Sequence, residues 1–184
     1  MTPLVLTLHQ RPEQRLDLSP LLPHLLAGKS ANEIARIELQ TTRMRVTVGD
    51  AFRLRMGDAQ YIRLEGACDR LDRVGAGLSA GAIEVAGDVG IQAGRQMTGG
   101  RLMIRGSAGH WVASAMKGGE IEITGSAGDL IGGPLAGEVA GMRGGLVIVR
   151  GNVGARAADR LRRGMIVVEQ ILTGWRLAIR SEDA

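Results

Sequence analysis

The chain has 184 residues, 45% of them apolar, and a net charge of +4, which suits one folded soluble domain and argues against disorder. Its one cysteine, Cys68, excludes an internal disulfide and any metal site built from several thiolates of this chain. The sequence contains neither an apolar run of eighteen residues nor a signal-peptide pattern, so we expect a cytoplasmic protein with no membrane contact.

The segment 1–43 is predicted to form one strand and two short helices. Leu4–Leu8 alternates between apolar and polar residues, as a strand does. Ser19–Pro20 supplies a cap and a first-turn proline for a helix that Gly28 ends. Ser30 and Glu33 have the spacing of a capping box, which predicts that a second helix begins there.

The segment 44–77 is predicted to be a lead-in of alternating strands. Three strands are expected at Met44–Val48, Phe52–Met56 and Tyr61–Glu65, and Gly-Asp pairs at 49–50 and 57–58 signal tight turns between them. Ile62–Gly66 matches Ile83–Gly87 at a distance of 21 residues. We therefore interpret this segment as a degenerate first coil of the repeats that follow.

The segment 78–170 repeats one pattern five times, with starts at residues 78, 97, 116, 142 and 161. The period is 19 residues, and seven extra residues at 133–139 lengthen one repeat. A fixed period near twenty indicates a solenoid. We predict a mainly β fold, a single-stranded right-handed parallel β-helix with 19-residue coils and a small N-terminal α/β lead-in. The segment 171–184 leaves the repeat and is expected to be a non-repeat tail.

Strand alternation within the repeats separates a core face from an outer face. Two columns of aliphatic residues are predicted to form the core: Ile83, Leu102, Ile121, Val147 and Ile166, and Val85, Ile104, Ile123, Val149 and Val168. Glycines follow each strand, at Gly87, Gly106, Gly125 and Gly151 and again three residues later. We assign them to corners where the chain turns or where neighbouring coils approach closely, and not to a nucleotide cradle.

The outer face changes from charged to aliphatic over the last two repeats. Leu146, Ile148, Met165 and Val167 are predicted to form a contiguous apolar patch, which in a multi-chain complex is typical of an interface. Trp111, at a corner next to His110, is a further candidate contact. The alternative is that the insertion 133–139 folds back over the patch.

The glycine spacing at 87, 90 and 94, repeated at 125, 128 and 132, resembles a glycine-rich domain found in two families. These are the large subunit of glutamate synthase, at its C-terminus, and the C-subunit of formylmethanofuran dehydrogenase. Ala113 and Ala158 replace the third glycine in two other repeats. The order of the motifs Val48–Asp50, Leu64–Gly66 and Asp69–Gly75 ahead of the repeats is similar to that C-subunit, especially in its bacterial formyltransferase/hydrolase form.

The resemblance implies a non-catalytic scaffold subunit of a hetero-oligomeric complex in one-carbon metabolism. Hydrolase-like and formyltransferase-like subunits are the implied partners. The implied methanofuran-type carrier has an anionic polyglutamate arm, and metals are expected on other subunits and no cofactor on this chain. All but two of the 23 basic residues are arginines, the residue best suited to gripping carboxylates. The candidates for guiding the arm are Arg95, Arg101, Arg105, Arg143 and Arg150.

No catalytic or metal site is predicted on this chain. The three histidines, His9, His24 and His110, are scattered, without the spacing that gathers a metal. Nucleic acid is not expected as a partner, because stacking aromatics are missing and the arginines alternate with acids. The alternative to the scaffold subunit is a freestanding spacer module like the glutamate synthase domain. A hexapeptide-repeat acyltransferase is disfavoured, because no six-residue aliphatic rhythm is present.

Overall fold

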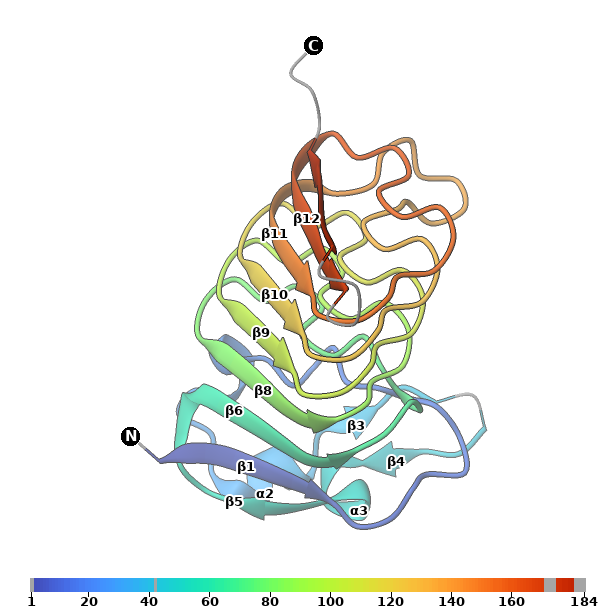
Figure 1. Cartoon of the computed structure of the whole chain (residues 1–184). Helices are drawn as coiled ribbons and strands as arrows, with labels where there is room; N and C mark the ends of the chain where they lie inside the picture. Colours follow the sequence, from blue (N-terminus) through green and yellow to red (C-terminus); the bar gives the residue numbers. More distant parts are fainter. Residues whose placement is uncertain (1, 42, 171–174, 181–184) are drawn as a thin grey trace.

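Nine strands form one large mixed sheet along the side of a stack of coils (Figure 1). The computed structural model describes residues 2–41, 43–170 and 175–180. The mainly β fold is confirmed. The strands of the large sheet are, in chain order, β1 (Pro3–Leu8), β5 (Phe52–Arg55), β6 (Asp58–Ala67), β8 (Ala82–Gly87), β9 (Arg101–Ile104), β10 (Glu120–Ile123), β11 (Arg143–Val149), β12 (Arg163–Gln170) and β13 (Trp175–Arg180).

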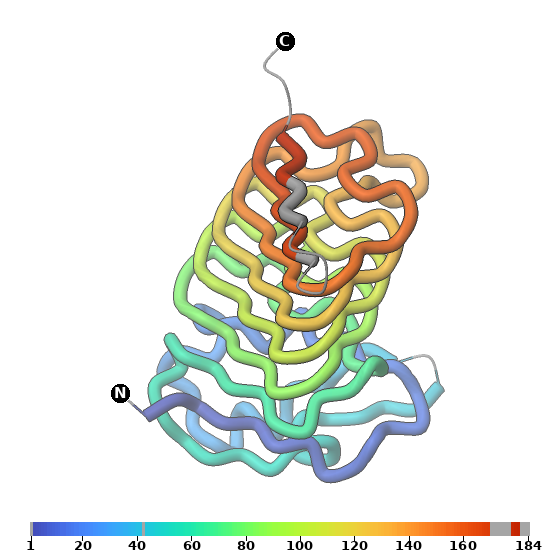
Figure 2. The backbone as a smooth tube through the Cα atoms, in the orientation of Figure 1, coloured from blue at the N-terminus to red at the C-terminus, as the bar shows by residue number. Residues whose placement is uncertain are grey.

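Short elements complete the described part of the chain. Two small sheets pair β2 with β7 and β3 with β4. These elements are β2 (Leu16–Asp17), α1 (Pro23–Leu26), α2 (Ala31–Ala35), β3 (Glu38–Leu39), β4 (Val46–Thr47), α3 (Val48–Ala51) and β7 (Leu71–Asp72). The tube in Figure 2 shows that the segment containing most of them lies at one end of the stack.

Strands β8 to β12 pair in parallel and in register, so equivalent residues of successive repeats lie side by side. Ile121, for example, is opposite Leu102 on one neighbouring strand and Val147 on the other. All ten predicted core residues are buried, with at most 8% of any of them exposed. Burying such a side chain stabilises the fold by about 1.5–3 kcal/mol. Strand β6 continues the stack, with Ile62 opposite Ile83, as the degenerate-coil interpretation predicts.

Side chains at two corners add hydrogen bonds from each coil to the next. At one corner, Ser107 Oγ accepts from the Ser126 N–H at 3.1 Å, and Ser126 Oγ accepts from the Asn152 N–H at 3.1 Å. At the other, His110 Nδ1 accepts from the Asp129 N–H at 2.9 Å. These bonds satisfy backbone donors that the corner would otherwise leave unpaired.

Left-handed backbone recurs at equivalent positions of successive coils. The bulky residues Gln92, Trp111 and Leu130 have φ of 62°, 58° and 59°. Each of their N–H groups donates to a carbonyl of the next coil, at 2.8 to 3.0 Å. Successive coils repeat this left-handed conformation, and its N–H groups are all hydrogen-bonded. We therefore attribute the conformation to the stacking of coils and not to local strain at a reactive site.

The corner glycines are required mainly by close approach. Gly106 is not left-handed, but a Cβ there would lie 2.5 Å from the carbonyl oxygen of Gly87 in the coil below. Real Cβ atoms do not approach backbone so closely. This confirms the structural assignment of these glycines.

Two details of the N-terminal prediction are wrong. Helix α1 begins after Leu22, with Pro23 in its first turn, so Ser19–Pro20 does not cap it. The Gly-Asp pair at 49–50 is not a tight turn but part of α3, because Thr47 and Asp50 form a capping box. At residues 57–58 the chain does reverse between β5 and β6, but these two strands do not pair with each other, because β1 lies between them. The capping box of Ser30 with Glu33 is confirmed.

The two edges of the large sheet are antiparallel. Strand β5 runs antiparallel to β1, and β13 runs antiparallel to β12. The segment 171–184, which leaves the repeat, therefore contributes a strand that extends the sheet by one position beyond the last coil. Its residues 171–174 and 181–184 lie outside the described residues.

We predict that Gly94→Ala destabilises the protein by about 2–5 kcal/mol. Gly94 has φ +65°, and a Cβ there would lie 2.2 Å from Ile121 Cδ1. Left-handed strain costs about 1–2 kcal/mol and overpacking about 1–3 kcal/mol. Ile121→Val removes that methyl group and costs about 0.5–1.5 kcal/mol alone. The double variant should lose at least about 1 kcal/mol less than the sum, as measured by urea unfolding.

Gly75→Ala is the matched control for this cycle. Gly75 has a similar φ of +69°, but its nearest neighbour is Leu102 Cδ2 at 3.1 Å. Gly75→Ala should lower the free energy of unfolding through its left-handed backbone, and its effect should add to that of Ile121→Val without a coupling energy. Strict additivity of Gly94→Ala and Ile121→Val would contradict the contact.

Candidate functional site

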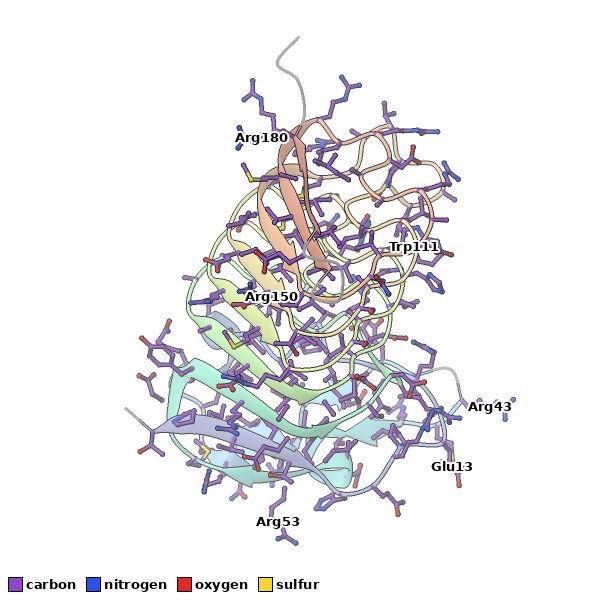
Figure 3. The ribbon with its side chains drawn as sticks, in the orientation of Figure 1. Glu13, Arg43, Arg53, Trp111, Arg150 and Arg180 are labelled. Carbon is purple, nitrogen blue, oxygen red and sulfur yellow. The ribbon has the colours of Figure 1, made fainter. Side chains whose placement is uncertain are left out.

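The outer face of the large sheet is an open surface of three parallel columns of side chains. Its central column contains Arg63, Glu84, Met103, Glu122, Ile148, Val167 and Ala178. Around Tyr61, Arg63 and Glu84 the face is slightly hollowed. Figure 3 shows Arg150 over this sheet, whereas Trp111 lies on the loop side of the stack.

A network of ion pairs crosses the middle of this face. Arg150 donates to Glu122 Oε1 from Nη2 at 2.9 Å and also binds Glu169. Arg101 donates to Glu122 Oε2 at 3.1 Å and lies 3.4 Å from Glu120. Hydrogen bonding to Arg150, together with Arg101, lowers the pKa of Glu122. The same bonds to Glu122 and Glu169 raise the pKa of Arg150.

The other predicted arm-binding arginines lie in different surroundings. Arg105 binds Glu84 on the same face at 2.5 Å. Arg95 is nearly buried on another side of the coils, where it binds Glu138 at 2.5 Å and Ser114 Oγ at 3.0 Å. Arg143 is exposed where β11 begins. The structure thus places Arg101, Arg105 and Arg150 on one face, each paired with glutamate, and separates Arg95 and Arg143 from them.

The predicted apolar patch is contiguous on the outer face. Leu146 is opposite Met165, and Ile148 is opposite Val167. All four side chains are half-buried. The patch therefore has the register that the column analysis predicts, with the Glu122 network on one side and β13 on the other.

The insertion 133–139 does not cover this patch, so the alternative is wrong. Arg95 holds the insertion through Glu138, whose carboxylate also accepts from the Leu135 N–H at 2.9 Å. Hydrogen bonding to Arg95 lowers the pKa of Glu138. The insertion instead borders a hollow lined by Trp111, Leu130 and neighbouring residues on the loop side. The pairing of the buried Ser114 and the half-buried Glu138 with Arg95 was not predicted, because a single polar residue gives no periodic signal.

No group of three or more His, Cys, Asp and Glu side chains able to hold a metal occurs in the described ranges. His110 accepts a backbone hydrogen bond and makes an edge-on contact with Trp111, with ring centroids 5.8 Å apart. Among the same residues, no helix is both long and apolar enough to span a membrane. The predictions that this chain has no catalytic site and binds no cofactor stay predictions.

An open sheet face with an ion-pair network and an apolar patch is typical of a protein-binding surface. The chain resembles subunits of known complexes. It is 42% identical over 77 residues to the C-subunit of the formyltransferase/hydrolase complex Fhc of Methylorubrum extorquens, covering 42% of this chain and 29% of the relative. It is 32% identical over 81 residues to the C-subunit of molybdenum-containing formylmethanofuran dehydrogenase 1 of Methanothermobacter marburgensis, covering 43% and 20%. No protein-family model matches the chain.

A solved structure matches over a longer range. It is the crystal structure of the formyltransferase/hydrolase complex FhcABCD from Methylorubrum extorquens with methylofuran. One of its chains superposes with a TM-score of 0.86 at 40% identity, over 88% of this chain and 61% of that chain. The matches thus span less than two thirds of the length of each relative. They confirm the resemblance to this C-subunit family.

We predict that Glu122→Gln lowers the free energy of unfolding by about 1 kcal/mol at pH 7, since part of the ion-pair network is exposed to solvent. The pKa of Glu122 is lowered in the folded protein, so its contribution is present above the unfolded pKa, about 4.3. This contribution is lost as the pH falls through the lower, folded pKa. Urea unfolding at pH 7 and pH 3 measures the change.

Glu84→Gln is the control, because Glu84 has a single, more exposed arginine partner. Its effect at pH 7 should be below that of Glu122→Gln. A Glu122→Gln difference that is the same at both pH values would contradict the assigned network.

Proposed function

We propose that the chain is a non-catalytic scaffold subunit of a cytoplasmic hetero-oligomeric complex that handles a formyl group on a methanofuran-type carrier. One observation carries the proposal: the TM-score of 0.86 at 40% identity to a chain of the FhcABCD complex. The two relatives named as C-subunits support it. Hydrolase-like and formyltransferase-like chains would be the partners, and metals would be held by those chains.

The scaffold role would depend on a rigid repeated fold. We propose that the coils wind as a right-handed parallel β-helix. Parallel pairing at 19-residue intervals supports this, as does a second row of parallel bridges that links Val89, Ala108, Ala127 and Val153 on another side of the coils.

The apolar patch of Leu146, Ile148, Met165 and Val167 would be the main contact with a partner protein. Its residues are half-buried on an open face, although the outer face of the preceding strands is charged. Exposed contiguous apolar surface is typical of interaction sites. The hollow beside Trp111 would provide a second contact on the loop side.

Guidance of the carrier's anionic arm remains part of the proposal. Arg95, Arg101, Arg105 and Arg150 are each bound to a glutamate. Arm carboxylates would therefore have to exchange with glutamates of the protein at these four positions. Arg143 has no such competitor within ion-pair distance in the described residues, which makes it the most accessible of the five candidates.

Affinity purification of the tagged chain from its native host tests the proposal. We expect hydrolase-like and formyltransferase-like chains to co-purify. Ile148→Glu should reduce their recovery at least about tenfold, because it buries a charge in an apolar contact. Met44→Glu, at an exposed apolar residue far from the patch, should leave recovery unchanged.

Thermal unfolding of each variant followed by circular dichroism verifies that both fold. If the native chain purifies alone, the freestanding spacer is the better account. If the native chain co-purifies with its partners and the Ile148→Glu variant recovers them in the same amount, the apolar patch is not the contact with the partner.

A further inference from the structure

Four cations gather at one corner of the coils, just ahead of β10 and at the beginning of β11 and β12. The N–H groups of Lys117, Arg143 and Arg162 each donate to a methionine carbonyl of the coil below, at 2.6 to 2.8 Å for the first two and 2.9 Å for the third. These bonds place the three residues above one another. Arg163 is paired with Arg143 across β11 and β12. All four side chains are exposed, and we name them the cationic corner.

The cationic corner has no counter-ion within the described part of the chain. No ion pair of the described residues brings a carboxylate within 4.0 Å of any of these four side chains. Glu138 is held by Arg95, and Arg143 acts on it only at longer range. Neighbouring coils are about 4.8 Å apart, well inside the screening length of about 10 Å at 0.1 M salt. Adjacent like charges destabilise a sheet, and a bound anion would relieve this repulsion.

The surroundings of the cationic corner favour carboxylates next to apolar side chains. Leu146 and Met165 of the apolar patch are opposite one another and follow Arg143 and Arg163 within two or three residues. Arginine binds a carboxylate with two parallel hydrogen bonds. An occupant could therefore pair acidic groups with the corner and place apolar groups on the patch.

A nucleic acid fits this surface less well. Single strands are bound by stacking on aromatic side chains, and β9 to β12 carry none. A phosphate backbone that crossed the sheet would also meet the carboxylates of Glu120 and Glu122.

We propose that the cationic corner is a docking site for an extended acidic peptide segment of a protein partner, whose apolar residues contact Leu146 and Met165. Lys117, Arg143, Arg162 and Arg163 would bind its carboxylates by charge-assisted hydrogen bonds. The proposal concerns the surface of this chain alone. It shares Leu146 and Met165 with the partner contact proposed above, but a peptide test on the isolated chain can succeed or fail independently of complex assembly.

Fluorescence anisotropy with the purified full chain tests this site. The probe is a labelled synthetic peptide with about six glutamates beside a short apolar stretch, a size chosen to span the corner and the patch. Arg143→Gln combined with Arg163→Gln should weaken binding at least about tenfold at 50 mM salt, and raising the salt should weaken binding to the native chain.

Arg53→Gln combined with Arg55→Gln is the matched control. Both residues are exposed arginines on β5, at the opposite end of the sheet, and the change in net charge is the same. The control should bind the peptide as the native chain does. Equal losses in the two double variants would show attraction by net charge and overturn the site. An oligothymidylate of equal charge that binds as tightly as the peptide would overturn the assignment to a peptide.

Discussion

Stacking of equivalent residues in successive coils is the constraint on which the rest of this structure depends. Parallel strands about 4.8 Å apart bring each side chain against its counterparts 19 or 26 residues away. On the inner face this alignment builds two aliphatic columns, because a single polar residue there would lack a partner. At the corners it admits glycine or a side chain that bonds the next coil, as Ser107, Ser126 and His110 do. The same alignment brings equivalent residues together on the outer face, where the side chains do not have to be apolar.

The side chains of the outer face therefore determine what the chain can bind. In its middle, Arg101 and Arg150 are each bound by glutamates, so that neither is free to bind a ligand. Toward the last coils the same columns become aliphatic, and the corner ahead of them carries four cations without carboxylate partners in the described ranges. A surface that is ion-paired in one part, apolar in the next and cationic at its border offers a partner both orientation and contact area. Relatives that are subunits of a complex agree with a surface of this kind.

Features that recur in every repeat could be predicted from the sequence, whereas features that occur once in the chain could not. The ten core residues, the register of the apolar patch and the pairing of Ile62 with Ile83 follow from a period that an alignment of the repeats reveals. Helix α3 was missed because its capping box of Thr47 and Asp50 has aspartate at the position where Glu or Gln is usual. The position of β1 between β5 and β6 is a long-range pairing that no local pattern encodes. The Arg95–Glu138 pair joins residues 43 positions apart, and for that reason the course of the insertion was not predictable.

The central claim is that the outer face of the last coils is the docking surface, and hydroxyl-radical footprinting tests it most directly. Met165 lies in the apolar patch, whereas Met44 is 66% exposed at the opposite end of the molecule. Both thioethers are oxidised when solvent reaches them. On assembly with its partners, the account predicts that oxidation of Met165 falls sharply while that of Met44 is unchanged. Oxidation of Met165 at the same rate in the free chain and in the purified complex would contradict it.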